Sequence, residues 1–140
     1  MKTVVLNKEI IENYIDEDWN LRINWNIRIE GDIRINWYIN ALGDIDASGN
    51  LKASENIVAW DKILVWWYLE AWKNIIAWEN VEAGWNIIAW ENIDSWENIF
   101  SRGKIEAWED IEAWGNIMAI GAIDAKGDID ARGYILEMQL

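Results

Sequence analysis

The chain has 140 residues, of which 52% are hydrophobic, and a formal net charge of −13. This length suits one domain with a substantial buried core. The charge disfavours direct binding to nucleic acid, because phosphate contacts need Lys and Arg, and it makes basic proteins the better candidate partners. The sequence lacks Cys and His, which removes disulfides, thiolate ligands and the commonest general base.

No stretch of the sequence is long and apolar enough for a membrane span, and the apolar run at the N-terminus is too short for a signal peptide. We therefore expect a soluble, cytoplasmic chain. No motif in the sequence indicates a cofactor or a metal ion, and we expect neither.

The dominant feature is an apolar residue at every sixth position from Ile15 to Ile135, which makes 21 hexads. A second column follows two positions later; it begins with Ile23 and becomes mostly Ala. Because side chains two residues apart share one face of a strand, each hexad predicts a short strand and a corner. A helix does not fit, since six residues advance about 600° and the apolar stripe would drift around its axis.

The tryptophans indicate how many hexads make one turn. At the third position after the apolar residue, the order Trp, Trp, other repeats every 18 residues between Trp72 and Trp114. A feature of one side must recur once per turn, so three hexads make one coil. The sequence therefore predicts an all-β fold, a single-stranded parallel β-helix with about seven triangular coils over residues 15–140. Residues 1–14 break the hexad phase and are expected to form an N-terminal cap or lead-in.

Seven of the tryptophans are expected to form two stacked ladders, because coils about 4.8 Å apart bring identical rings within stacking distance. The predicted ladders are Trp60, Trp78, Trp96 and Trp114, and Trp72, Trp90 and Trp108. One interpretation is that the rings stack on one another and shield the Ala-lined edge of the core. The other is an aromatic platform for a sugar, a peptide or another copy of the protein.

The fourth position carries carboxylates in the middle coils. This candidate acidic face consists of Glu55, Asp61, Glu79, Glu91, Glu97 and Glu109. It is either a solvated face, a weak cation site or a surface for a basic partner. Asn or Asp often precedes the apolar residue, where we expect backbone hydrogen bonds at the corners and amide ladders.

The C-terminal end shows no polar cap in the sequence, since the repeat runs through Ile135 and is followed by Met138, Gln139 and Leu140. An uncapped solenoid exposes apolar core and unpaired strand edges. We therefore expect Ile135, Met138 and Leu140 to make end-to-end contacts with another copy.

Three hexads resemble the repeats of bactofilins, which are bacterial cytoskeletal proteins: GDIDAS from Gly43, GAIDAK from Gly121 and GDIDAR from Gly127. The resemblance implies a triangular β-helix that polymerises end to end without nucleotide. The acyltransferases with hexapeptide repeats are less similar, because their small residue comes four positions after the aliphatic one and this chain lacks their catalytic histidine.

The leading hypothesis is a non-enzymatic structural or scaffold protein that self-associates through its ends and its Trp-rich faces, as in a bactofilin-like polymer. Its expected partner is itself, as a homo-oligomer or filament. Two alternatives stay open. One is an acidic nucleic-acid mimic, of phage or mobile-element type, that inhibits a DNA- or RNA-handling protein. The other is a carbohydrate-binding module that uses the tryptophan ladders.

Overall fold

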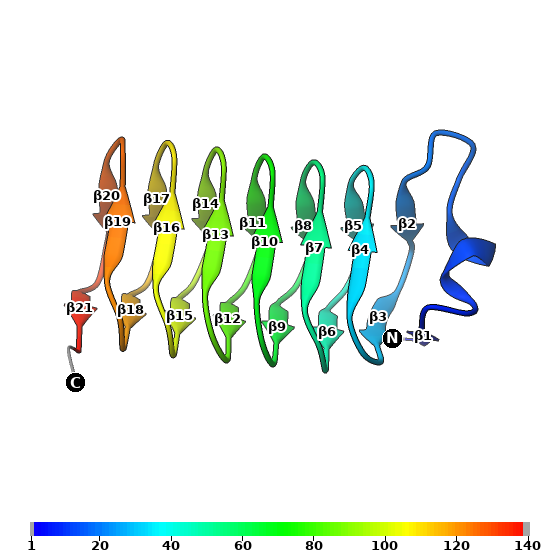
Figure 1. Ribbon diagram of the computed structural model, residues 1–140. Coiled ribbons are helices and arrows are strands. Elements are labelled where there is room, and N and C mark those ends of the chain that lie inside the picture. Colours follow the sequence, from blue (N-terminus) through cyan, green and yellow to red (C-terminus); the bar gives the residue numbers. More distant parts are fainter. Residues whose placement is uncertain (1, 139–140) are drawn as a thin grey trace.

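The computed structural model describes residues 2–138, and these form a parallel β-solenoid with three sheets along its length (Figure 1). Each sheet forms one side of a triangular prism. We call the eight-, seven- and six-stranded sheets A, B and C, and successive strands along the chain belong to sheets B, A and C in turn. Residues 2–138 contain no α-helix, and no helix among them is long and apolar enough to cross a membrane. The predicted all-β fold with triangular 18-residue coils is confirmed.

The strands of each sheet follow one another along the solenoid axis in chain order. Sheet A contains β1 (Thr3–Leu6), β3 (Asn26–Ile29), β6 (Ile45–Ala47), β9 (Ile63–Val65), β12 (Val81–Ala83), β15 (Ile99–Ser101), β18 (Ile117–Ala119) and β21 (Ile135–Glu137). Sheet B contains β2 (Leu21–Ile23), β5 (Ile39–Ala41), β8 (Ile57–Ala59), β11 (Ile75–Ala77), β14 (Ile93–Ser95), β17 (Ile111–Ala113) and β20 (Ile129–Ala131). Sheet C contains β4 (Ile33–Ile35), β7 (Leu51–Ala53), β10 (Leu69–Ala71), β13 (Ile87–Ala89), β16 (Ile105–Ala107) and β19 (Ile123–Ala125).

Neighbouring hexad strands in a sheet are parallel and come from successive coils. In sheet B, for example, Ile75 lies beside Ile57 on one side and Ile93 on the other. This register aligns identical hexad positions, so the apolar residues stack in columns inside the prism. Every residue of the two inward columns from Leu21 to Ala119 is buried. Each buried Ile or Leu contributes about 1.5–3 kcal/mol gross, before chain entropy is subtracted.

The Asn and Asp residues before the strands bind backbone groups at the corners. Asn56 Oδ1 accepts hydrogen bonds from the backbone N–H of Asn74 at 3.0 Å and from its Nδ2 at 3.1 Å. Asn74 Oδ1 accepts the same pair from Asn92, at 2.9 and 3.1 Å. Equivalent bonds occur at the other corners, for instance from Asn98 to Asn80 and from the N–H of Lys104 to Asn86. The predicted backbone bonds and amide ladders are confirmed.

The N-terminal segment covers one end of the solenoid (Figure 1, blue). β1 pairs with β3 and adds buried Val4 and Leu6 to the core, and the 3₁₀ helix η1 (Ile11–Tyr14) places buried Ile11 near the first coil. The regular repeat does not begin at Ile15, which instead forms an isolated antiparallel bridge with Leu21.

A turn explains why Ile15 departs from the hexad pattern. The Asp16 carboxylate accepts hydrogen bonds from the N–H groups of Asp18 and Asn20, both at 3.0 Å, and Trp19 has a positive φ of 67°. The chain therefore reverses where the pattern predicts a strand. Sheets A, B and C contain eight, seven and six strands, so the solenoid has about six turns, close to the predicted seven.

Candidate interaction surfaces

Two tryptophan ladders run along the corners that flank sheet B. The first ladder is Trp60, Trp78, Trp96 and Trp114, which follow sheet B strands, and the second is Trp72, Trp90 and Trp108, which follow sheet C strands. Within each ladder, neighbouring ring centroids lie 4.8–6.1 Å apart and the ring planes differ by 8–11°. These values are typical of offset stacking. The predicted stacking is confirmed in both ladders.

Each ladder ends in a cation that occupies the next ring position. Lys126 Nζ lies 3.4 Å from the centroid of the Trp108 ring, and Arg132 Cζ lies 3.7 Å from that of Trp114. Both residues follow their tryptophan by one coil, so the cation replaces the ring that the ladder would otherwise continue with. A cation over an indole face is attractive, by roughly 0.5–2 kcal/mol.

The stacking decides which part of each ladder is accessible. An inner ring such as Trp78 or Trp90 has another indole on both faces, and these two are 39% and 41% exposed. What they present to solvent is mainly ring edge. A sugar that stacks on an aromatic side chain needs a free face, so the geometry supports the shielding interpretation better than the platform.

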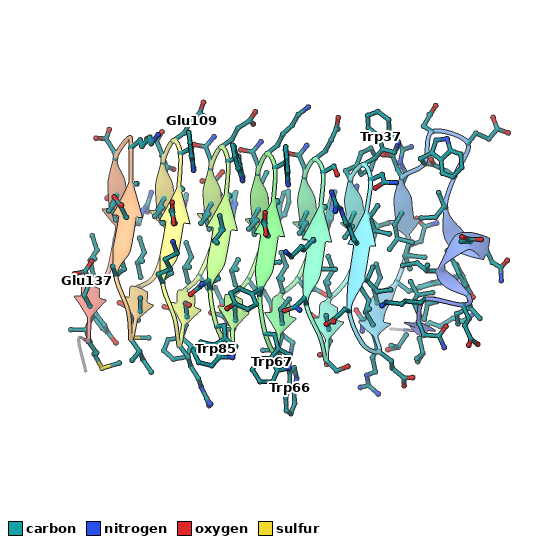
Figure 2. All side chains as sticks on the ribbon, in the orientation of Figure 1. Trp37, Trp66, Trp67, Trp85, Glu109 and Glu137 are labelled. Atoms are coloured by element: carbon teal, nitrogen blue, oxygen red, sulfur yellow. The ribbon has the colours of Figure 1, made fainter. Side chains whose placement is uncertain are left out.

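The third corner, between sheets A and C, carries a different arrangement. Trp66, Trp67 and Trp85 project from the lower edge in Figure 2. Trp67 and Trp85 stack, with centroids 6.2 Å apart and planes at 14°. Trp66 has no stacked ring among residues 2–138 and is 64% exposed, because Gly84 occupies the next ring position. Sequence reasoning missed this site, although a glycine at the third position was its signal.

The predicted acidic face is wrong as a single surface, because neighbouring hexads turn onto different sides of the prism. Glu55, Glu91 and Glu109 belong to the corner between sheets C and B, whereas Asp61, Glu79 and Glu97 belong to the corner between sheets B and A. Figure 2 shows Glu109 on the upper edge. The carboxylates therefore form two columns, each beside a tryptophan ladder.

Neighbouring side chains partly neutralise the column at the upper edge. Lys73 lies between Glu55 and Glu91 in this column, and its Nζ is 3.4 Å from Glu55 Oε1. Glu91 Oε2 accepts a hydrogen bond of 2.9 Å from Asn74 Nδ2. Among the described residues, no group of three or more acidic side chains is arranged to hold a metal ion.

A further acidic group on the outer face of sheet B escaped the sequence reasoning. Asp94 of β14 pairs in register with Glu112 of β17. Burial is the main cause that raises the pKa of Asp94 to about 6, and the negative charges of Glu112 and Asp110 add to it. This carboxyl is therefore partly protonated near pH 6.

The C-terminal coil presents three strand edges together. Within residues 2–138, β19, β20 and β21 each have a paired neighbour on one side only. Ile135 is 48% exposed, although its column is buried in the earlier coils, and Met138 is also exposed. Leu140, the third predicted end contact, lies outside the described residues.

One side chain partly caps this end, which sequence reasoning did not expect. Glu137 occupies the inward position that Ala119 holds one coil earlier (Figure 2). Its Oε1 accepts a 2.7 Å hydrogen bond from the backbone N–H of Ile123. This N–H would otherwise be an unpaired donor at the edge of sheet C, so the carboxylate satisfies it.

Comparisons with protein-family models, with curated proteins and with solved structures gave no match. The structure itself shows a parallel β-solenoid with 18-residue coils, and the surfaces described above are the basis for any functional proposal.

Proposed function

We propose that the protein is a non-enzymatic structural protein that self-associates through its C-terminal coil. The observation that carries this proposal is the edge of β19, β20 and β21, where the inward column ends in exposed Ile135. Unpaired strand edges beside exposed core favour pairing with another chain. A second copy has the same triangular cross-section, so it can extend all three sheets at once.

The two ends differ in a way that favours a tail-to-tail dimer. The N-terminal end is covered by β1 and η1, with Val4, Leu6 and Ile11 buried there. The C-terminal coil of one copy therefore finds its best match in the C-terminal coil of another, in a two-fold symmetric contact. A bactofilin-like filament would need a second contact between the N-terminal segments.

The charges of the last coil are compatible with such a contact. Lys126 and Arg132 lie in the same coil as Asp128 and Asp130, so two copies related by a two-fold axis can pair opposite charges. Glu137 opposes association, because its carboxylate lies at the inward position of the edge and already occupies one N–H. We therefore expect a reversible dimer rather than an obligate one.

The two alternative functions receive less support from the geometry. Carbohydrate stacking needs ring faces, and most faces in the ladders are covered by neighbouring indoles. A nucleic-acid mimic needs a continuous stripe of carboxylates, whereas in this solenoid they form two columns and Lys73 interrupts one of them. The lack of His and Cys further supports a non-enzymatic role.

Sedimentation velocity over a range of protein concentrations tests the proposal. The wild type should show a concentration-dependent monomer–dimer equilibrium. Ile135→Asp should weaken the dimer at least about tenfold, because it places a charge in the apolar contact. Val5→Asp is the matched control, since Val5 is similarly exposed on β1 at the other end, and it should leave the equilibrium unchanged.

Two results would overturn the proposal, provided that circular dichroism shows folded variants. One is a wild type that stays monomeric at every concentration. The other is a dimer that Val5→Asp disrupts and Ile135→Asp does not.

A further inference from the structure

The third corner repeats the pattern of the two ladder ends with one ring missing. In the first ladder the order in successive coils is Trp96, Trp114, Arg132, and in the second it is Trp90, Trp108, Lys126. In the equivalent column of sheet A the order is Trp66, Gly84, Arg102, because Val65, Ala83 and Ser101 lie in register just before them. An indole and a cation thus stand two coils apart, roughly 9.6 Å, with no ring between them.

The missing ring leaves a hollow of about 270 Å³ on the outer face of sheet A. Its lining includes Leu64, Trp66, Glu82, Phe100 and Arg102, with the Gly84 backbone between the two ends. This volume lies just below the range for drug-sized ligand pockets, roughly 300–1,000 Å³. The hollow therefore suits one ring system of modest size.

The backbone at Gly84 keeps this hollow open. The Gly84 N–H donates a 2.9 Å hydrogen bond to the Val65 carbonyl, and a Cβ on Gly84 would overlap the carbonyl oxygen of Trp66. A side chain at this position is therefore excluded unless the backbone shifts. In both ladders a tryptophan fills the equivalent position, whereas here no side chain of the column fills the space beside Gly84.

The two ends of the hollow are both available to a ligand. Trp66 is 64% exposed, more than the other tryptophans of this corner, and it stacks on no other ring among residues 2–138. Arg102 takes part in none of the ion pairs formed within residues 2–138. The terminal ring of each ladder lies between an indole face and a cation, Arg132 in the first ladder and Lys126 in the second, and Trp66 and Arg102 supply the same two kinds of group here.

We propose that this slot binds a planar, electron-rich aromatic ring of about indole size, as a small molecule. The ring stacks on Trp66 on one face and receives Arg102 on the other, which reproduces the Trp–Trp–cation order of the ladder ends. Leu64 and Phe100 contact its edges. The Glu82 carboxylate is placed to accept a hydrogen bond from a ring N–H. This inference is independent of the C-terminal contact and stands if self-association fails.

Isothermal titration calorimetry with indole as the probe tests the site on the whole chain. We expect about one indole per chain for the wild type. Trp66→Ala should weaken binding at least about tenfold and Arg102→Ala about fivefold, because each removes one side of the sandwich. Arg28→Ala is the matched control, since it removes the same charge from an exposed position on β3, and it should bind indole like the wild type.

A variant that should gain an indole site provides a second test, which does not depend on variants that weaken binding. Trp108→Ala removes the ring between Trp90 and Lys126 and so opens an equivalent slot in the second ladder. Indole stoichiometry should then rise from about one to about two per chain. Circular dichroism of each variant confirms the fold.

Cyclohexylmethanol separates ring recognition from a generic apolar hollow, because it has similar bulk but no planar π-system. It should bind at least about tenfold more weakly than indole. The proposal is overturned if the wild type binds no indole, if the alcohol binds equally well, or if Arg28→Ala weakens binding as much as Arg102→Ala. A stoichiometry of one in Trp108→Ala would also contradict it.

Discussion

The middle and last coils of the solenoid have the same hexad pattern but different surroundings. Ile87 of β13 is fully buried, with β10 and β16 paired on its two sides. Ile135 of β21 occupies the same hexad position, yet it is 48% exposed and only β18 pairs with its strand. In a solenoid, burial therefore comes from the adjacent coil and not from the hexad itself. The middle coils are therefore packed on both sides, whereas the last described coil is packed on one side only.

Truncating the two isoleucines should show the largest difference between these regions. Ile87→Ala should lower the free energy of unfolding by about 2–5 kcal/mol, because it leaves a cavity in closed packing. Ile135→Ala should cost less than about 1 kcal/mol in the monomer, since its side chain is half exposed. Urea denaturation at protein concentrations below dimer formation measures both changes. Equal losses of stability in the two variants would show that Ile135 is as well packed as Ile87.

Removing the carboxylate at the edge should change association rather than stability. Glu137→Ala restores the alanine of the inward column, removes a charge from the contact and frees the Ile123 N–H for pairing. We expect the dimer to tighten about tenfold, or about 1.4 kcal/mol, by sedimentation equilibrium. Glu30→Ala, an equal change of charge in the first coil, should leave the equilibrium unaltered. Weaker association of Glu137→Ala would mean that the carboxylate makes the contact.

The free energy of unfolding should depend on pH through Asp94, which lies on the outer face of the middle coils. Its pKa of about 6 in the folded protein exceeds its ordinary value of 3.8, so the folded state binds this proton more tightly than the unfolded chain does. Stability from this group is therefore fully present below about pH 4 and is lost as the pH rises through about 6. Asp94→Asn should raise the free energy of unfolding at pH 7 by about 1 kcal/mol, since solvent screens a partly buried group, and should change it little below pH 4.

Asp130 offers the matched control for this prediction in the last coil. It lies in the same outward column of sheet B but is exposed. At protein concentrations below dimer formation, Asp130→Asn removes an equal charge and should change stability by less than about 0.5 kcal/mol at pH 7. Thermal or urea unfolding at pH 4 and pH 7 decides the comparison. A loss of stability in Asp94→Asn at pH 7 would show that the ionised Asp94 carboxylate, which is penalised first by burial and then by its acidic neighbours, does not destabilise the fold.

Most of the fold is predictable from the sequence, because periodicity encodes it directly. The six-residue spacing indicates strand and corner, and the 18-residue recurrence of tryptophan indicates three sheets and both ladders. The departure at Ile15 is not visible in this pattern. It depends on the turn that the Asp16 carboxylate stabilises and that brings Ile15 antiparallel to Leu21.

The candidate surfaces are only partly predictable, because they depend on contacts between coils. The raised pKa of Asp94 requires both its burial and the charges of Glu112 and Asp110. Two signals were nevertheless present in the sequence. Glu137 replaces alanine in the inward column, and Gly84 replaces tryptophan at the third position. The first places a carboxylate at the edge of the last described coil, and the second leaves a hollow beside Trp66.

The most direct test of tail-to-tail association is a distance measurement by double electron–electron resonance. The native sequence has no cysteine, so Met138→Cys and Val5→Cys each carry one spin label, at opposite ends of the chain. The strands β1 and β21 are the first and the eighth of sheet A, so they lie seven spacings of about 4.8 Å, or roughly 34 Å, apart. A tail-to-tail dimer should therefore place Met138 labels within about 25 Å of each other and Val5 labels about 70 Å apart. Short distances between Val5 labels, with long or absent distances between Met138 labels, would contradict association through the C-terminal coil.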